Sequence, residues 1–144
     1  MPLIGTFAAF LVFLIGMVMR NNAVRMAGLA VYVVMALTIV PTYLSGEGAE
    51  EKVEHIAGIS NDAIEEHEEH AELALWLMVA AAVIGIVTFI AFWKTLRTDL
   101  TTGLSILFIV AAVAGFIKVG ITAHEGGEIR RPDLGAPPSP ESKQ

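Results

Sequence analysis

Hydrophobic and polar positions along this chain fall into long blocks rather than short repeats. Four blocks contain almost only apolar residues, at positions 3–19, 26–44, 73–93 and 104–121. An α-helix needs about 20 apolar residues to cross a hydrocarbon core about 30 Å thick, and each block is close to that length. The pattern predicts an all-α membrane protein. We expect a four-transmembrane-helix up-down bundle that forms one membrane domain over residues 1–131.

The composition supports this interpretation. Hydrophobic residues make up 55% of the 144 residues and charged residues 17%, against about 25% charged residues in a soluble domain. The mean hydropathy is +0.66. The chain has no cysteine, which excludes disulfides and thiolate metal sites. Arg20, rather than a cleavage site of small residues, follows the first block, so we interpret this block as a span and not as a signal peptide.

The positions of helix-breaking residues predict the lengths of the second and third helices. No breaker occurs between Asp62 and Trp93. We therefore expect one helix of about 33 residues, about 50 Å long, whose polar first part stands outside the bilayer. Pro41 removes the amide that would bond to the Leu37 carbonyl, and it should bend or end the second helix.

Three further segments have clear local patterns. Residues 49–57 place apolar and acidic positions on opposite sides of a helix and predict a short amphipathic helix on the membrane surface. Gly126 and Gly127 predict a sharp turn after the fourth helix. Residues 132–144 are rich in proline, serine and charge and predict a disordered tail.

Small residues recur along one side of each of the last two helices. In lipid, small residues let helices approach closely, so these stripes predict packing seams. The stripe of the third helix comprises Ile64, His67, Ala71, Ala74, Met78, Ala82 and Gly85. The stripe of the fourth comprises Ala111, Ala114, Gly115, Lys118 and Thr122.

The two ends of the predicted bundle carry opposite charge. The short connections at 20–25 and 94–103 are mainly basic, whereas the segment 45–72 holds ten acidic residues and one lysine. Basic connections face the cytoplasm by the positive-inside rule. We therefore expect a multi-pass protein of the bacterial inner membrane, with an acidic extracytoplasmic loop and both termini outside the cytoplasm.

Imidazoles and carboxylates are concentrated where the third helix begins. Positions 65–72 hold five glutamates and two histidines. Side chains three or four residues apart on a helix are neighbours, and imidazoles beside carboxylates bind Zn²⁺, Cu²⁺ or Fe. The alternative is a solvated acidic helix start that the helix dipole stabilises. The candidate metal ligands are Glu66, His67, Glu68, His70, His124 and Glu125.

A haem b site is another alternative for the same residues. A b-type haem in a membrane bundle needs axial histidines on facing helices. His67 or His70 opens the third helix and His124 closes the fourth, so in an antiparallel pair they lie at similar depth. Lys118, Arg130 and Arg131 are then the candidates to contact the propionates. No second histidine pair occurs near the other end, which excludes a two-haem path across the membrane.

Lys118 is a charged residue inside the fourth apolar block. An intramembrane charge is costly and normally has a partner. Two alternatives are open: the amine extends outward to the interface, or it pairs with Glu72 or Glu125.

Three motifs stand in order along the chain: TYLSGEGAE, GISNDAIEEHEEHAE and HEGGEIRRPDL. Together they make residues 42–134 resemble a family of small bacterial four-span membrane proteins of unknown function. The resemblance implies a place near cytochrome-like and redox modules. The chain departs from the family pattern at two places. Arg131 stands where the family pattern leads us to expect a histidine. Residues 1–10 also lack the histidines that tend to open the family's first span. The family signature falls on Gly46, Glu47, Ala49, Glu50, His67, Glu68, Gly126, Gly127, Ile129 and Arg130.

Two functions remain open from the sequence. The first is a non-catalytic accessory protein or subunit whose acidic face docks a membrane or periplasmic partner. The second is a membrane protein that binds haem b or a divalent metal and has a redox role. The chain offers no nucleophile–base constellation and no phosphate-binding loop, which disfavours an enzyme. We expect membrane lipid as a partner and, with a net charge of −6, no nucleic acid.

Overall fold

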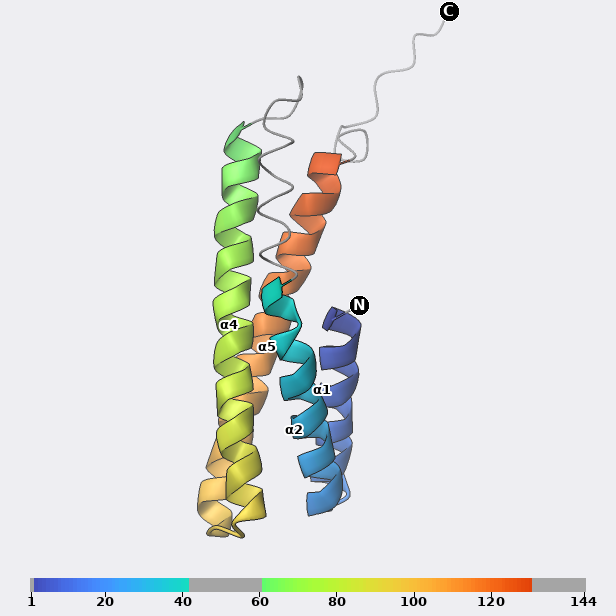
Figure 1. Cartoon of the computed structure of the whole chain (residues 1–144), viewed down its shortest axis with the longest axis vertical. Helices are drawn as coiled ribbons and strands as arrows, with labels where there is room; N and C mark the ends of the chain where they lie inside the picture. The colour runs from blue at the N-terminus through green and yellow to red at the C-terminus, as the bar shows by residue number, and fades with distance from the viewer. Residues whose placement is uncertain (1, 42–60, 131–144) are drawn as a thin grey trace, which may run out of the picture.

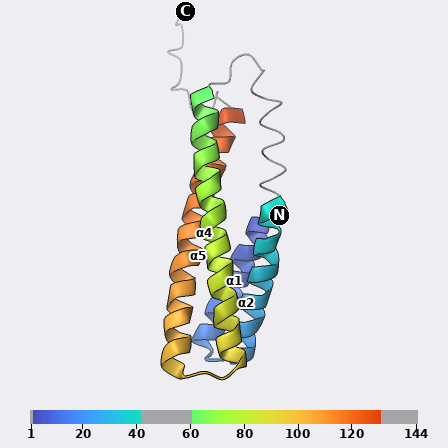
Figure 2. The ribbon, with the colours of Figure 1, turned by 60° about the vertical axis from the view of Figure 1, so that its left-hand side comes forward.

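The computed structural model describes residues 2–41 and 61–130. Within these ranges the chain forms four α-helices that run alternately in opposite directions (Figure 1). They are α1 (Pro2–Val18), α2 (Asn22–Leu37), α4 (Asn61–Trp93) and α5 (Thr98–Arg130). Helix α1 pairs with α2, α4 pairs with α5, and α2 packs beside α4 (Figure 2). The all-α up-down prediction is confirmed. The predicted surface helix at 49–57 and the tail at 132–144 lie outside the described residues.

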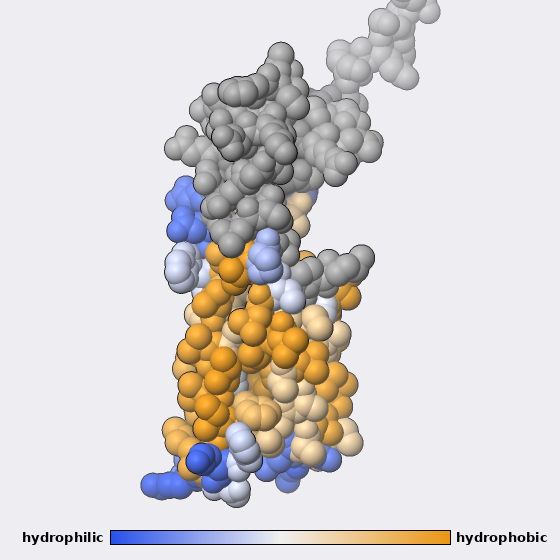
Figure 3. Space-filling view, viewed as in Figure 1, coloured by the Kyte–Doolittle hydropathy of each residue, from blue (hydrophilic) through white to orange (hydrophobic). Residues whose placement is uncertain are grey.

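The described helices have the length and apolarity that a bilayer requires. Three segments are long and apolar enough to cross a membrane: Asn22–Pro41, Glu69–Trp93 and Thr98–His124. Leu3–Val18 is also apolar but shorter. On the face shown in Figure 3, hydrophobic side chains cover the middle of the molecule, and hydrophilic ones lie below this band and at its upper left. Large apolar side chains such as Val110 and Ile117 are each 60% exposed. This surface is typical of a protein surrounded by lipid.

The two helical hairpins differ in length. Helices α4 and α5 have 33 residues each, whereas α1 has 17 and α2 has 16. At 1.5 Å per residue, these helices are about 50 Å and about 25 Å long. The prediction of one uninterrupted helix up to Trp93 is confirmed. The α4–α5 hairpin extends beyond the α1–α2 hairpin at one end only (Figure 1).

The two short turns, between α1 and α2 and between α4 and α5, have the same backbone geometry. A residue in the left-handed region follows α1 and another follows α4: Arg20 with φ 53° and Thr95 with φ 51°. The amide after each of these residues donates to a carbonyl five residues back, which satisfies the last turn of the helix. These bonds join Asn21 N to Gly16 O at 3.0 Å and Leu96 N to Ala91 O at 3.1 Å.

We expect Thr95→Gly to raise the free energy of unfolding by about 0.5–1 kcal/mol, because a β-branched residue is strained at positive φ and glycine is not. The matched variant Thr98→Gly introduces glycine into the first turn of α5 and should lower stability. Unfolding by SDS titration in mixed micelles measures both changes. Equal destabilisation by both variants would contradict the left-handed conformation at Thr95.

Direct backbone contact holds α1 against α2. A Cβ added at Gly28 would lie 2.5 Å from the Phe13 amide nitrogen and 3.0 Å from the Ala9 carbonyl oxygen. A Cβ added at Gly16 would likewise lie 2.6 Å from the Arg25 amide nitrogen. Glycine at these positions lets the two helices approach more closely than any side chain would allow.

Gly28→Ala is therefore expected to destabilise the bundle by about 1–2 kcal/mol: overpacking costs up to about 3 kcal/mol, and the better helix propensity of alanine returns about 1 kcal/mol. Gly103→Ala is the matched control, because no described atom lies within 4 Å of an added Cβ there. This control should be neutral or stabilising in the same SDS titration. If the two variants behaved alike, the close α1–α2 contact would be wrong.

The α4–α5 seam uses small and hydroxyl side chains. Gly115 receives the Met78 side chain, with the sulfur 2.7 Å from a Cβ position. The Thr88 hydroxyl donates to the Ile84 carbonyl on its own helix at 2.7 Å. The buried seam of α5 consists of Thr101, Ser105, Phe108, Ala112 and Gly115.

Aromatic rings fill the wider space between the hairpins. The Phe108 ring is fully buried and lies 5.1 Å from Phe13 and 5.0 Å from Tyr32, centroid to centroid. Phe116 forms the next layer, 5.5 Å from both Phe7 and Phe10. The nearly perpendicular rings match the edge-to-face arrangement that aromatic pairs prefer.

Two local predictions have different outcomes. Helix α2 ends at Leu37, the residue whose carbonyl loses its donor to Pro41, and helical structure resumes at residues 39–41 after Thr38, so the predicted break appears as an interruption. The turn predicted at Gly126 and Gly127 is wrong, because α5 continues through both glycines to Arg130. Adding residues to an existing helix avoids the cost of nucleation, and this offsets the low propensity of two glycines.

Candidate functional site

The histidine- and glutamate-rich region lies at the end of the α4–α5 hairpin that is remote from the two short turns (Figure 1). We define the acidic end as the first part of α4, residues 61–72, together with the last part of α5, residues 122–130. Helix α4 begins at Asn61 without interruption from the polar into the apolar sequence. The glutamates of 65–72 therefore stand on a continuous helix and not in a loop.

The antiparallel register of α4 and α5 brings two candidate histidines to the same level. Met78 contacts Gly115, so these two residues lie opposite each other. His70 is eight residues from Met78 toward the acidic end, and His124 is nine residues from Gly115 in the same direction. Both are thus about 12–14 Å beyond this contact along their helices.

The same contacts mark where the shorter hairpin stops. Phe7 lies beside Phe116, and Pro2 is five residues further along α1 toward the acidic end. The start of α1 is therefore level with Ile121 of α5. The acidic end lies beyond this level. On α4 it extends the helix by about 18 Å past the start of α1.

The described side chains of the acidic end differ in exposure. His70 is half-buried, whereas Glu69, Glu72 and His124 are exposed. Among the described side chains, no three histidine or carboxylate groups converge on a common metal position. Five other candidates lie on the helices, but their side chains are outside the described part: Glu66, His67, Glu68, Glu125 and Arg130.

Lys118 is half-buried on α5, about two turns from His124. It forms no ion pair within 4.0 Å with any described carboxylate. Glu72, one of its two predicted partners, instead accepts a hydrogen bond of 3.3 Å from the indole nitrogen of Trp76 on the next turn. The other predicted partner, Glu125, has a side chain outside the described part.

The opposite end of the bundle, which we call the basic end, comprises residues 17–25 and 91–105. There Arg25 of α2 has a structural role that its sequence position did not indicate. Its guanidinium donates to the Gly16 carbonyl at 3.1 Å and the Met17 carbonyl at 3.3 Å, both in the last turn of α1. It also lies over the Phe92 ring of α4, 5.5 Å from the centroid. Arg25 thus joins three helices, whereas in the sequence it counts only as a charge that sets orientation.

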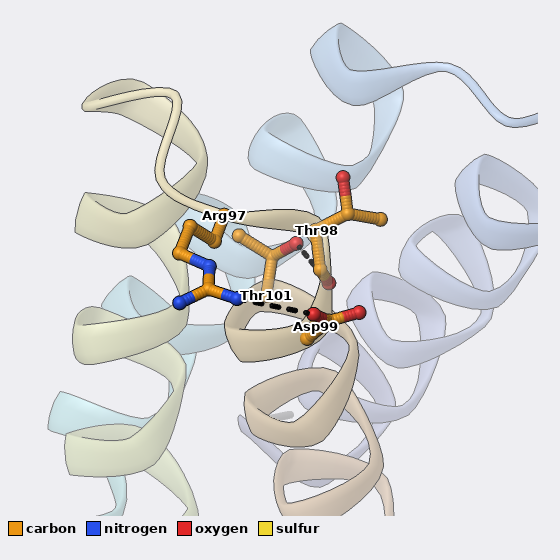
Figure 4. Close-up of polar contacts among 4 residues, drawn as sticks. All are labelled: Arg97, Thr98, Asp99 and Thr101. Atoms are coloured by element: carbon orange, nitrogen blue, oxygen red, sulfur yellow. Dashed lines mark hydrogen bonds and ion pairs between the residues drawn. The ribbon is translucent and has the colours of Figure 1, made fainter.

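A polar cluster begins α5 at the same end. Arg97 and Asp99 form an ion pair of 3.7 Å, and both side chains are about nine-tenths exposed (Figure 4). The Thr101 hydroxyl donates to the Thr98 carbonyl at 3.0 Å. The cluster places the hydroxyl groups of Thr98 and Thr101 beside Arg25.

Comparisons with known protein families, curated proteins and solved structures find no match to this chain. The function therefore has to be argued from the geometry of the two ends.

Proposed function

We propose that this chain is a small accessory protein or subunit of the bacterial inner membrane, and that its acidic end docks a cationic partner outside the cytoplasm. One observation carries the proposal: the α4–α5 hairpin is about twice as long as α1–α2, and the extra length holds the glutamate-rich sequence. A helix that serves only to cross the bilayer needs about 20 residues.

The charges of this extension also support a docking role. Glu65 and Glu69 are a like-charge pair four residues apart, as are Glu68 and Glu72. Such pairs destabilise a helix by roughly 0.2–0.5 kcal/mol each. The sequence has no lysine or arginine between Glu54 and Lys94 to offset them. A cationic partner surface would remove this repulsion and would be steered toward the acidic end.

A photo-cross-linking amino acid at position 69 tests the docking role in living cells. We expect a discrete protein adduct at position 69 that weakens with rising salt and is lost when Glu65, Glu68 and Glu72 are changed to glutamine. The same amino acid at position 97, on the basic end, is the control and should not give this adduct. An adduct that persists in the glutamine variant would overturn the electrostatic mechanism.

Cysteine labelling tests the orientation separately. A membrane-impermeant maleimide added to intact cells should modify Gly48→Cys and leave Arg97→Cys unmodified until the cells are opened. The reverse pattern would place the acidic end in the cytoplasm.

The level shared by His70 and His124 favours a second candidate function, binding of haem b or a divalent metal. In that case purified protein should show either a Soret band or stoichiometric metal, and His70→Ala and His124→Ala should each remove it. A protein without haem absorbance and without bound metal would eliminate this candidate and leave the docking role standing.

A further inference from the structure

Two adjoining cavities open at the basic end, between the ends of all four helices. They share Arg25, Phe92, Thr98 and Thr101 in their walls. The larger has a volume of about 270 Å³ and is also lined by Arg20 and Ser105. A cavity of this size accommodates a small polar group rather than a large ligand.

The walls of the larger cavity have a positive charge that no described carboxylate balances. Arg20 and Arg25 line it, and among the described residues no aspartate or glutamate does. The nearest acidic residue of the α5 start, Asp99, is 91% exposed and pairs with Arg97. The cavity therefore favours an anion.

The donors at this cavity suit phosphate oxygens. Arg25 has five N–H groups, and three of them bond to Gly16, Asn22 and Met17. The Arg20 amide donates to the Met17 carbonyl, but the Arg20 guanidinium forms no hydrogen bond or ion pair with a described residue and is available. Guanidinium groups bind phosphate in a bidentate manner, and the Thr102 hydroxyl on the same wall adds a further donor.

The position of the cavity favours a lipid as the source of the phosphate. Its apolar wall is formed by Met17 and Phe92. Trp93, which follows Phe92 in the sequence, is 70% exposed, as expected at a membrane–water boundary. Basic pockets between transmembrane helices at this depth are suited to anionic lipid headgroups. We propose that the cavity binds the phosphate group of an anionic phospholipid. This site is at the opposite end of the bundle from the docking surface and does not depend on the proposed function.

Native mass spectrometry of the purified full chain in detergent, titrated with dioleoylphosphatidylglycerol, tests this site. We expect saturable binding of one lipid that Arg20→Gln weakens roughly tenfold, because one charged hydrogen-bonding group is lost. Thr102→Val, which lines the same cavity without changing the charge, should also weaken it. Arg97→Gln is the matched control, since it removes an equal charge from the same end but lies outside the cavity, and it should leave the affinity unchanged.

Two comparison ligands separate the sources of the phosphate. Dioleoylphosphatidylcholine should bind more weakly than phosphatidylglycerol, and inorganic phosphate at millimolar concentration should not displace the lipid. Displacement by phosphate with the same dependence on Arg20 would retain the phosphate site and assign it a soluble ligand. Equal weakening by Arg20→Gln and Arg97→Gln, equal affinity for both lipids, or the absence of saturable binding would each overturn the proposal.

Discussion

Phe108→Ala is expected to lower the free energy of unfolding by about 3–5 kcal/mol, the largest effect of any single substitution considered for this chain. The Phe108 side chain is fully buried and packs against Phe10, Phe13 and Tyr32 of the other hairpin. A cavity here weakens the packing between the two hairpins, which the contact of α2 with α4 still joins. SDS titration of the reconstituted protein, followed by circular dichroism, measures the loss.

Leu107→Ala is the matched control for this prediction. Leu107 is the neighbouring residue on the same helix but is 52% exposed, on the surface assigned to lipid. Lipid chains fill the space left by the smaller side chain, so its removal should cost less than about 1 kcal/mol. A similar loss for Leu107 and Phe108 would mean that the packed face of α5 is wrongly assigned.

Arg25→Ala is expected to have the second largest effect, a loss of about 2–3 kcal/mol. Hydrogen bonds from a charged group contribute about 1.5–3 kcal/mol, and a cation–π contact adds about 0.5–1 kcal/mol. Arg25 makes both kinds of interaction, with the carbonyls of Gly16 and Met17 and with the Phe92 ring. The variant should unfold at lower SDS concentration, and Arg25→Lys should recover only part of the stability because a lysine cannot reproduce the planar fork.

Arg97→Ala removes the same charge from the same end of the bundle. Its ion pair with Asp99 is about nine-tenths exposed on both sides, and such pairs contribute little. Stability should not change measurably. If Arg97→Ala destabilised the bundle as strongly as Arg25→Ala, the effect of Arg25 would come from net charge and not from its contacts.

The sequence was a good guide where one strong physical term decides the structure. The absence of a breaker between Asp62 and Trp93 correctly predicts a single long helix. Lipid requires every backbone group of the apolar part to bond within the helix, and the polar part extends this helix without a new nucleation step. Pro41 correctly predicts an interruption of the second helix, which lies at Thr38. The small-residue stripe of α4 is also confirmed over Ala74, Met78, Ala82 and Gly85, which are all buried.

The packed face of α5 could not be predicted as well. The expected stripe includes Ala111, Ala114 and Lys118, but these are only half-buried, while Ala112 and Phe108 are fully buried. The prediction assumed that small residues mark the packed face of α5. The gap between the hairpins, however, is wide enough to need an aromatic ring. Hydroxyl groups also reach the seam, because bonds to their own helix satisfy them: Ser105 donates to the Thr101 carbonyl at 2.7 Å.

The two ends of the bundle illustrate the same limit for site residues. A density of glutamate and histidine is visible in the sequence, so the acidic end was predicted directly. The role of Arg25 depends on three-dimensional contacts with the end of α1 and with α4, which no local pattern encodes. The continuation of α5 past Gly126 likewise depends on the helix that precedes it rather than on the glycines alone.

The central claim is that lipid surrounds the apolar surface of this bundle. Nitroxide labels attached to cysteines at positions 110, 113 and 117, in protein reconstituted into phosphatidylcholine vesicles, test it most directly. These three side chains are 40–60% exposed, so the labels should collide frequently with oxygen, which concentrates in lipid, and rarely with a water-soluble nickel chelate. Labels at positions 69 and 97 should show the opposite preference. Nickel accessibility at 110, 113 and 117 as high as at 97 would contradict the account.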